Sequence, residues 1–138
     1  MALKLLVPLT TLATDNEQTA VSPRTLTGAG TTFSREYPEL GAYSRAIWML
    51  DVTAQSGTTP TLDVKIQGWD VLSGKWRDVI TFTQVTGAQV PITPAAQTGQ
   101  LDYQLYRASF VVGGTATPTF TFTLGAICHS EEPIVVGR

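Results

Sequence analysis

The chain has 138 residues and a mass of 14.8 kDa, with 43% apolar and 14% charged residues. This length predicts one domain that can bury a conventional hydrophobic core without covalent cross-links. A single cysteine excludes a disulfide scaffold, and a net charge of -2 without a basic block argues against a nucleic-acid partner. No apolar run approaches the roughly 20 residues that span a bilayer, so we expect a soluble protein with no membrane partner.

Threonine is the most informative residue type. The chain contains 22 threonines and 18 valines and isoleucines, which together make 29% of it β-branched. Such side chains lose rotamer freedom in a helix and pack well on a pleated sheet. The composition therefore predicts an all-β fold. Glycines and prolines are spread along the chain instead of gathering in one linker, so no internal domain boundary is indicated.

The N-terminal segment is short and apolar. It faintly resembles a signal peptide, but a proline interrupts the apolar stretch and the cleavage position is weak. We expect residues 1–17 to form an N-terminal strand or arm and residues 18–138 to form a β-sandwich domain. The segment is either the first strand of its own sheet or a strand added to a neighbouring subunit or shell. In the second case the partner-binding residues are Leu3, Lys4, Leu5, Leu6, Val7 and Leu9.

One internal near-repeat organises the middle of the chain. Residues 46–67 and 103–124 both read as a strand, a loop with Gly, Thr and Pro, and a second strand of period two. The pattern predicts two hairpins, each of which presents one apolar face to a core. The apolar positions in the second strands are Leu62, Val64 and Ile66, and Phe120, Phe122 and Leu124.

A third hairpin is predicted between the repeats, with its turn at residues 72–75. The Gly- and Thr-rich stretch 27–40 is expected to be a long surface loop. Together the segments fit a single antiparallel β-sandwich of about seven or eight strands, either jelly-roll-like or immunoglobulin-like. Further strands are expected over residues Gln18–Leu26, Tyr43–Val52 and Val90–Thr93.

Residue types that carry catalysis are scarce. Cys128 and His129 are the only cysteine and histidine, and neighbours on a strand point to opposite faces. No set of side chains has the spacing of a zinc site, and no nucleophile elbow occurs. We therefore expect no catalytic residue, no metal and no cofactor, and Cys128 as a buried apolar filler. Four aspartates in the central strands alternate with apolar residues: Asp51, Asp63, Asp70 and Asp78. This alternation is typical of a solvated outer face. The alternative is that these aspartates converge as a calcium site or a glycosidase pair.

The three tryptophans have two interpretations. Trp48 shares its parity with apolar neighbours and is expected in the core, whereas Trp69 and Trp76 flank one turn and are expected to pair across strands. The alternative is an aromatic platform for stacking on sugars, formed by Tyr43, Trp69 and Trp76.

Several strand and turn motifs between residues 43 and 128 carry a family resemblance. They are Leu50–Ala54, Ser56–Thr58, Pro60–Val64, Trp69-Asp70, Trp76–Val79, Thr81–Thr83 and Gly114–Phe120. This combination resembles the small β-sandwich virion proteins of tailed bacteriophages, and most of all their capsid decoration, or head-stabilising, proteins.

The resemblance implies a non-enzymatic structural protein that binds the major capsid protein on the outside of the virion and stabilises the shell. It also implies a homotrimer that is soluble in the host cytoplasm before assembly. Two other functions stay open: a neck, tail or fibre-associated part of a virion, and a carbohydrate-binding module.

Overall fold

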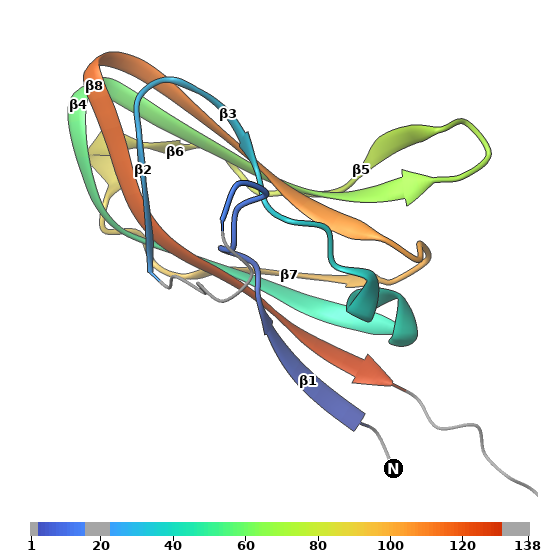
Figure 1. Ribbon diagram of the computed structural model, residues 1–138. Helices are drawn as coiled ribbons and strands as arrows, with labels where there is room; N and C mark the ends of the chain where they lie inside the picture. The colour runs from blue at the N-terminus through green and yellow to red at the C-terminus, as the bar shows by residue number, and fades with distance from the viewer. Residues whose placement is uncertain (1–2, 16–22, 131–138) are drawn as a thin grey trace, which may run out of the picture.

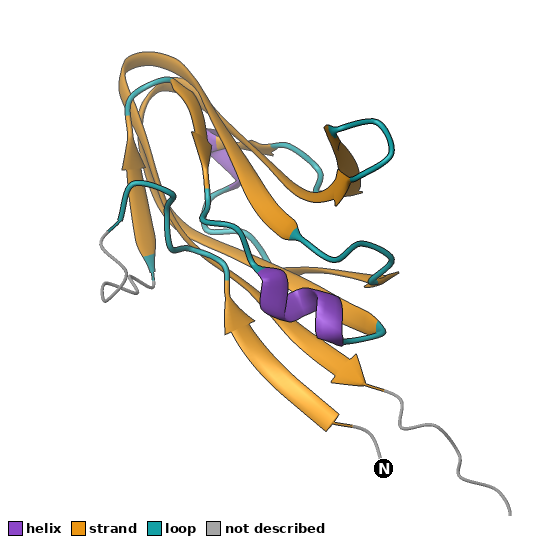
Figure 2. Cartoon of the chain, turned by 45° about the vertical axis from the view of Figure 1, so that its right-hand side comes forward, coloured by secondary structure: helices purple, strands orange, loops and turns teal. Residues whose placement is uncertain are grey.

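The computed structural model describes residues 3–15 and 23–130, and within them the chain forms eight strands and two short 3-10 helices (Figures 1 and 2). All strand pairs are antiparallel, which confirms the predicted all-β class and the expected number of strands. The elements are β1 (Leu3–Pro8), β2 (Arg24–Thr27), β3 (Gly30–Phe33), η1 (Pro38–Ala42), β4 (Arg45–Asp70), β5 (Lys75–Thr81), β6 (Val85–Thr86), η2 (Gly87–Gln89), β7 (Ala95–Gln100) and β8 (Tyr106–Ser130).

Two long strands, β4 and β8, run through the whole molecule. They pair antiparallel over almost their entire length, from Arg45 opposite His129 to Gly68 opposite Tyr106. Both strands bend midway, so that one continuous sheet folds back on itself and forms two facing layers (Figure 1). The fold is therefore β-sandwich-like, and its two layers share the same two central strands.

Each layer adds its own edge strands to these central strands. The first layer contains residues 45–56 of β4 and 119–130 of β8, with β7 beside β4 and with β1 and β2 along β8. The second layer contains residues 61–70 of β4 and 106–113 of β8, with β3 beside β8 and with β5 and β6 beside β4. Side chains alternate along each strand between the inner face and an outer face.

The bends replace the two hairpins that the near-repeat predicts. Leu62 does not fold back onto residues 46–54 but pairs with Val112, so each repeat is one bent strand that pairs with the other repeat. At the bends, Gly57 and Gly114 have φ angles of 104° and 117°, a region that glycine enters without steric cost. The hairpin prediction was wrong because a hairpin and a bent strand share the same alternating pattern.

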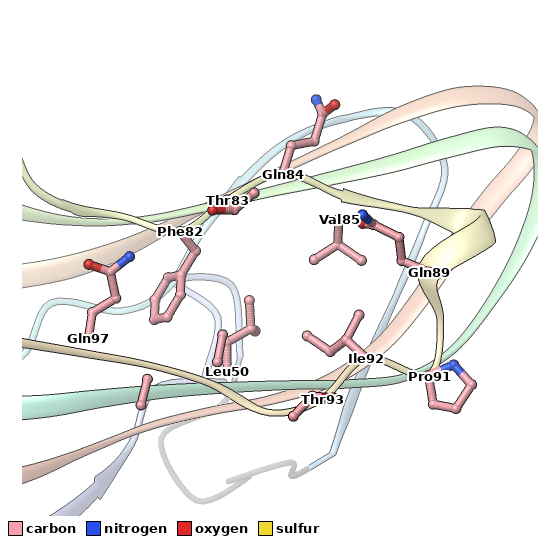
Figure 3. Close-up of a pocket in the computed structure, with 12 residues that line it drawn as sticks. Leu50, Phe82, Thr83, Gln84, Val85, Gln89, Pro91, Ile92, Thr93 and Gln97 are labelled. Carbon is pink, nitrogen blue, oxygen red and sulfur yellow. The ribbon is translucent and has the colours of Figure 1, made fainter.

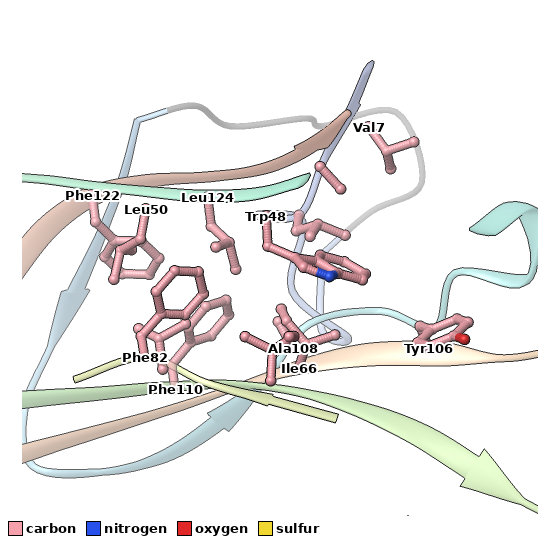
Figure 4. Close-up of a cluster of buried hydrophobic side chains, with 14 of the residues drawn as sticks. Val7, Trp48, Leu50, Ile66, Phe82, Tyr106, Ala108, Phe110, Phe122 and Leu124 are labelled. Atoms are coloured by element: carbon pink, nitrogen blue, oxygen red, sulfur yellow. The ribbon is translucent and has the colours of Figure 1, made fainter. Parts of the chain in front are cut away.

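The hydrophobic core lies between the inner faces of the two layers (Figure 4). Trp48 is fully buried, as its parity predicts, and the rings of Phe110 and Phe122 meet from opposite layers with centroids 5.0 Å apart. Cys128 is also fully buried, which confirms its expected place in the core. The inward positions predicted from the repeat are confirmed as buried: Leu62, Val64, Ile66, Phe120, Phe122 and Leu124.

The third hairpin is confirmed. Trp69 lies opposite Trp76 where β4 turns into β5, and the turn lies between Asp70 and Lys75. The strand expected from Tyr43 is the first half of β4, which begins at Arg45. The strand expected over 18–26 is seen as β2 from Arg24 onward, and residues 18–22 lie outside the described part of the chain.

Two expectations about irregular segments were wrong. Residues 90–93 form no strand; β7 begins at Ala95, directly after Pro94, because prolines cannot donate a backbone hydrogen bond to the sheet. The stretch 27–40 is not one long surface loop, since it contains β3 and ends on the fully buried Leu40. The glycines and threonines of this stretch do not predict a strand, because β3 is formed by its pairing with β8.

Candidate functional site

The N-terminal segment lies within the sheet of its own chain. Strand β1 pairs with the last part of β8, from Leu3 opposite Ser130 to Pro8 opposite Gly125, and this register places Lys4 and Leu5 in the strand as well. Val7 and Leu9 face the core and are buried, whereas Leu6 faces outward and is 67% exposed. The structure describes the side chains of three of the residues predicted to bind a partner, Leu6, Val7 and Leu9, and of these Leu6 is the one at the surface.

Leu6 begins an apolar strip on the outer face of the first layer. In register across three strands, Leu6 lies opposite Ile127 and Ile127 lies opposite Ile47. The next outward row of the sheet holds Met49 beside Ala96 of β7. We call these five residues the apolar strip; Ala96 is exposed, and Ile47, Met49 and Ile127 are half-buried.

Sequence reasoning missed most of the strip, although a signal was present. Residues 46–50 are apolar at every position, so both faces of this strand are apolar, whereas a strand with one solvated face should alternate. Polar and charged groups border the strip, with Arg45 and His129 in the outward row on one side and Asp51 on the other. An apolar sheet face with a charged rim is the usual composition of a protein interface.

The outer face of the second layer carries a different feature. The guanidinium of Arg107 on β8 lies 3.9 Å from the ring centroid of Phe33 on β3 and 4.3 Å from that of Trp76 on β5. Its Nε–H donates to Oε1 of Gln67 on β4 at 2.8 Å. Trp76 in turn contacts Trp69, with centroids 5.4 Å apart. We call these five residues the arginine–aromatic row, which crosses all four strands.

Two aspartates near the row are already paired within the chain. Asp78 accepts hydrogen bonds from Gln67 at 3.0 Å and from Lys65 at 3.2 Å, and these two donors lower the pKa of its carboxyl. Asp70 accepts from the Ser73 hydroxyl, from the backbone of the hairpin turn and from Arg77, and these bonds lower its pKa.

Arg107 differs from these paired groups in its surroundings. Burial against the two rings lowers the pKa of its guanidinium, because desolvation disfavours the charged form. An ion pair formed at this guanidinium is therefore worth more than one formed at a fully solvated side chain.

The three aromatic residues of the carbohydrate alternative are divided between two places. Trp69 and Trp76 form the expected cross-strand pair, whereas Tyr43 precedes the first half of β4 and packs against the core. One face of Trp76 is covered by Arg107. Trp69 instead lines a hollow of about 560 Å³ together with Pro38, Asp102 and Tyr103.

A second hollow, also of about 560 Å³, opens between β7 and the β5–β6 side of the sandwich (Figure 3). Its inner wall is apolar, with Phe82, Val85 and Ile92, and its rim carries glutamine and threonine side chains. No ionisable side chain is among the residues that line it, so this hollow offers shape and neutral hydrogen bonds only.

The remaining candidates for chemistry do not converge. Cys128 is fully buried, and desolvation raises the pKa of its thiol to about 11, so the nucleophilic thiolate is not formed near neutral pH. Asp63 accepts a hydrogen bond from Gln84, apart from the pairs made by Asp70 and Asp78. Among the described residues, no group of three or more His, Cys, Asp or Glu side chains could hold a metal ion.

No protein-family model and no curated protein sequence matches the chain. None of the helices in the described part of the chain is long and apolar enough to cross a membrane.

Proposed function

We propose that the protein is a non-enzymatic structural protein of a bacteriophage virion, a decoration protein that binds the major capsid protein on the outside of the shell as a homotrimer. The proposal starts from the sequence resemblance between residues 43 and 128 and small virion proteins of this kind. A decoration protein needs a rigid body and surfaces complementary to its partners, and it needs no reacting group.

The apolar strip is the observation that carries the proposal. Leu6 is 67% exposed and continues across the sheet into Ile127 and Ile47, so a lone chain would leave a flat apolar face in water. Interfaces between identical subunits are more apolar than other interfaces. We therefore assign the strip to self-association. In a threefold ring each strip is buried against a different face of the next subunit.

The arginine–aromatic row fits the contact with the capsid. Tryptophan and arginine are the residues most enriched at the energetic centre of protein interfaces, and here they are held rigidly on four strands. Three such rows in one trimer would act together, so that modest affinity at each contact adds up to a durable clamp on the shell.

The first test is the solution mass of the protein by size-exclusion chromatography with light scattering. We expect a mass near three times the 14.8 kDa of one chain. The double variant Leu6→Asp/Met49→Asp should run as a monomer. The matched control Leu72→Asp alters a leucine that is 97% exposed and lies outside the strip, so it should stay trimeric. A monomeric wild-type protein contradicts the trimer.

The second test is cosedimentation with purified phage heads and, separately, with purified tails. Binding to heads that saturates and raises their resistance to heat supports the decoration function. Binding to tails alone contradicts it and favours a neck, tail or fibre-associated part of the virion.

A carbohydrate-binding module is the second candidate, because Trp69 and Tyr103 line one hollow together with the carboxylate of Asp102. Aromatic rings beside hydrogen-bonding groups are the usual elements of a sugar site. Titration with neutral oligosaccharides, followed by tryptophan fluorescence, tests this function. A saturable change that Trp69→Ala removes and Trp48→Phe retains would favour it over the structural function.

A further inference from the structure

The arginine–aromatic row contains a cation that is held in place without a salt bridge to any described residue. The Arg107 guanidinium lies between the rings of Phe33 and Trp76, at 3.9 and 4.3 Å from their centroids, and its Nε–H is directed to Gln67. Rings on two sides and a hydrogen bond at Nε restrict the side chain to one orientation. Little rotational freedom is then left for Arg107 to lose when it binds a ligand.

Most of the hydrogen-bonding capacity of Arg107 is unused. A guanidinium has five N–H donors in a planar fork, and the hydrogen bond to Gln67 uses one of them. Within the described residues, the two Nη groups have no acceptor and Arg107 makes no salt bridge. The exposed carboxylate of Glu36 acts on it only over a longer distance.

The neighbouring cations differ from Arg107 in this respect. Lys65 is paired with Asp78 and Arg77 is paired with Asp70, each at 3.2 Å. Among the described residues, these two cations on the neighbouring strands are thus paired, whereas the cation between the rings makes no salt bridge. A partner that matches this surface brings a single negative charge to the middle of an aromatic patch.

We propose that Arg107 binds an aspartate or glutamate side chain of a protein partner through its two Nη groups, with Phe33 and Trp76 as the apolar rim of the contact. A carboxylate matches the planar fork of the guanidinium with two parallel hydrogen bonds. The proposal rests on the proposed function in one respect only: in a virion this partner is the capsid surface.

A protein carboxylate fits better than the phosphates of a nucleic acid. Nucleic-acid binding relies on several unpaired cations, whereas Lys65 and Arg77 are neutralised within the chain and the net charge is -2. A half-buried arginine between a phenylalanine and a tryptophan is instead typical of the centre of a protein–protein contact.

The test uses the purified full-length protein and three synthetic probes at about 0.15 M salt, where exposed charges more than about 8 Å apart are largely screened. The probes are a blocked tetraglutamate peptide, a blocked tetraglutamine peptide and a short oligothymidylate. Intrinsic tryptophan fluorescence reports binding, because Trp76 touches the guanidinium, and the NMR signal of the Arg107 Nε–H reports the site. We expect saturable binding of tetraglutamate at millimolar concentration, typical of a single contact, and no response to tetraglutamine.

Three variants separate charge, geometry and general electrostatics. Arg107→Gln should abolish tetraglutamate binding, and Arg107→Lys should weaken it about tenfold because a lysine has no planar fork. Lys75→Gln removes one exposed charge elsewhere on the β4–β5 hairpin and should keep the affinity within about twofold, since a distant surface charge is screened. Unchanged thermal melting shows that a variant is folded. If Arg107→Gln does not fold, the reduced affinity of Arg107→Lys tests the proposal instead.

Equal binding by Arg107→Lys and wild type, an equal response to tetraglutamine, or tighter binding of the oligothymidylate would each overturn the proposal. These titrations need neither phage heads nor a trimer. Their failure is therefore distinguishable from a failure of the decoration function, which is measured by cosedimentation and solution mass.

Discussion

Gly57 lies directly against Pro118: a Cβ atom at position 57 would come within 2.7 Å of the Pro118 Cα. The reciprocal contact exists at the other bend, where a Cβ at Gly114 would lie 3.0 Å from the Cα of Pro60. Gly57 begins the bend segment Gly57–Thr61, which contains Pro60, and Gly114 begins the bend segment Gly114–Thr119, which contains Pro118. Each glycine therefore contacts the proline of the opposite segment. The two repeats are thus locked together where the sheet folds over.

The close contact predicts that Gly57→Ala is strongly destabilising. Alanine at this position meets both an unfavourable φ of 104° and the backbone of the opposite bend. We expect a loss of about 3 kcal/mol in the free energy of unfolding, measured by urea denaturation. Gly28→Ala is the matched control: its φ is 91° and nothing lies within 4 Å of its Cβ position, so it should lose only about 1 kcal/mol. Equal losses would show that backbone strain alone is responsible.

The buried thiol predicts a loss of stability at alkaline pH. Burial raises the pKa of Cys128 from 9.0 to about 11, so between these values the thiol ionises in the unfolded chain but not in the folded one. The unfolded state then binds fewer protons, and its free energy falls relative to the folded state as pH rises. The contribution is intact below pH 9 and is lost by about pH 11.

Urea midpoints at pH 7, 9, 10 and 11 measure this loss, with Cys128→Ala as the comparison. The variant should decline less between pH 9 and 11. Its remaining decline above pH 10 belongs to Tyr106, whose pKa burial raises from 10.0 to about 12, and to Tyr37, whose pKa burial also raises. Parallel curves for the two proteins would contradict the assignment to Cys128.

Two aromatic core positions should respond very differently to truncation. Phe122 packs on Phe110 across the two layers, so Phe122→Ala should cost about 3–5 kcal/mol through lost burial and a cavity. Trp48 is fully buried, but its indole N–H has no hydrogen-bond partner among the described residues. Trp48→Phe removes that unsatisfied donor while it leaves a smaller cavity, and the two effects should offset each other to within about 1 kcal/mol. Urea denaturation of both variants checks the contrast, and similar losses would contradict it.

Removal of residues 2–9 should weaken the fold itself. The deletion takes away the pairing of β1 with β8 and two buried side chains, Val7 and Leu9. We expect a lower melting temperature by differential scanning calorimetry, by analogy with other deletions of large apolar side chains. The control Leu72→Asp alters an exposed residue outside both β1 and the apolar strip and should melt within a few degrees of wild type. If the deletion melted like wild type, β1 would not be part of the folded body.

Local patterning was sufficient for the class of fold and for the inward faces. The alternation of Leu62, Val64 and Ile66 predicts which side of the strand is buried whatever the strand pairs with. It cannot reveal the partner strand, because pairing is a contact between distant residues. For this reason the alternating pattern predicts hairpins where the structure has bent strands. The pattern also predicts a loop at β3, since Gly30 and Thr31 have no strong strand pattern of their own.

On the surfaces, too, local features can be predicted from the sequence and contacts between distant residues cannot. Trp69 and Trp76 could be paired from sequence because one short turn separates them. Arg107 lies between Trp76 and Phe33 because β3, β8, β4 and β5 are neighbours in the folded sheet. The spacing of these three residues in the sequence does not predict that contact. The apolar strip could have been found, since Ile47 and Met49 alternate with residues that are themselves buried.

The sharing of β4 and β8 by both layers has a mechanical consequence. A sandwich built from separate sheets can shear open along the plane between them, whereas here the same two strands carry tension from one outer face to the other. A pull applied between Leu6 and Arg107 is transmitted along β8 and resisted by its hydrogen bonds with β4 throughout. Such a body should rupture in one step under force.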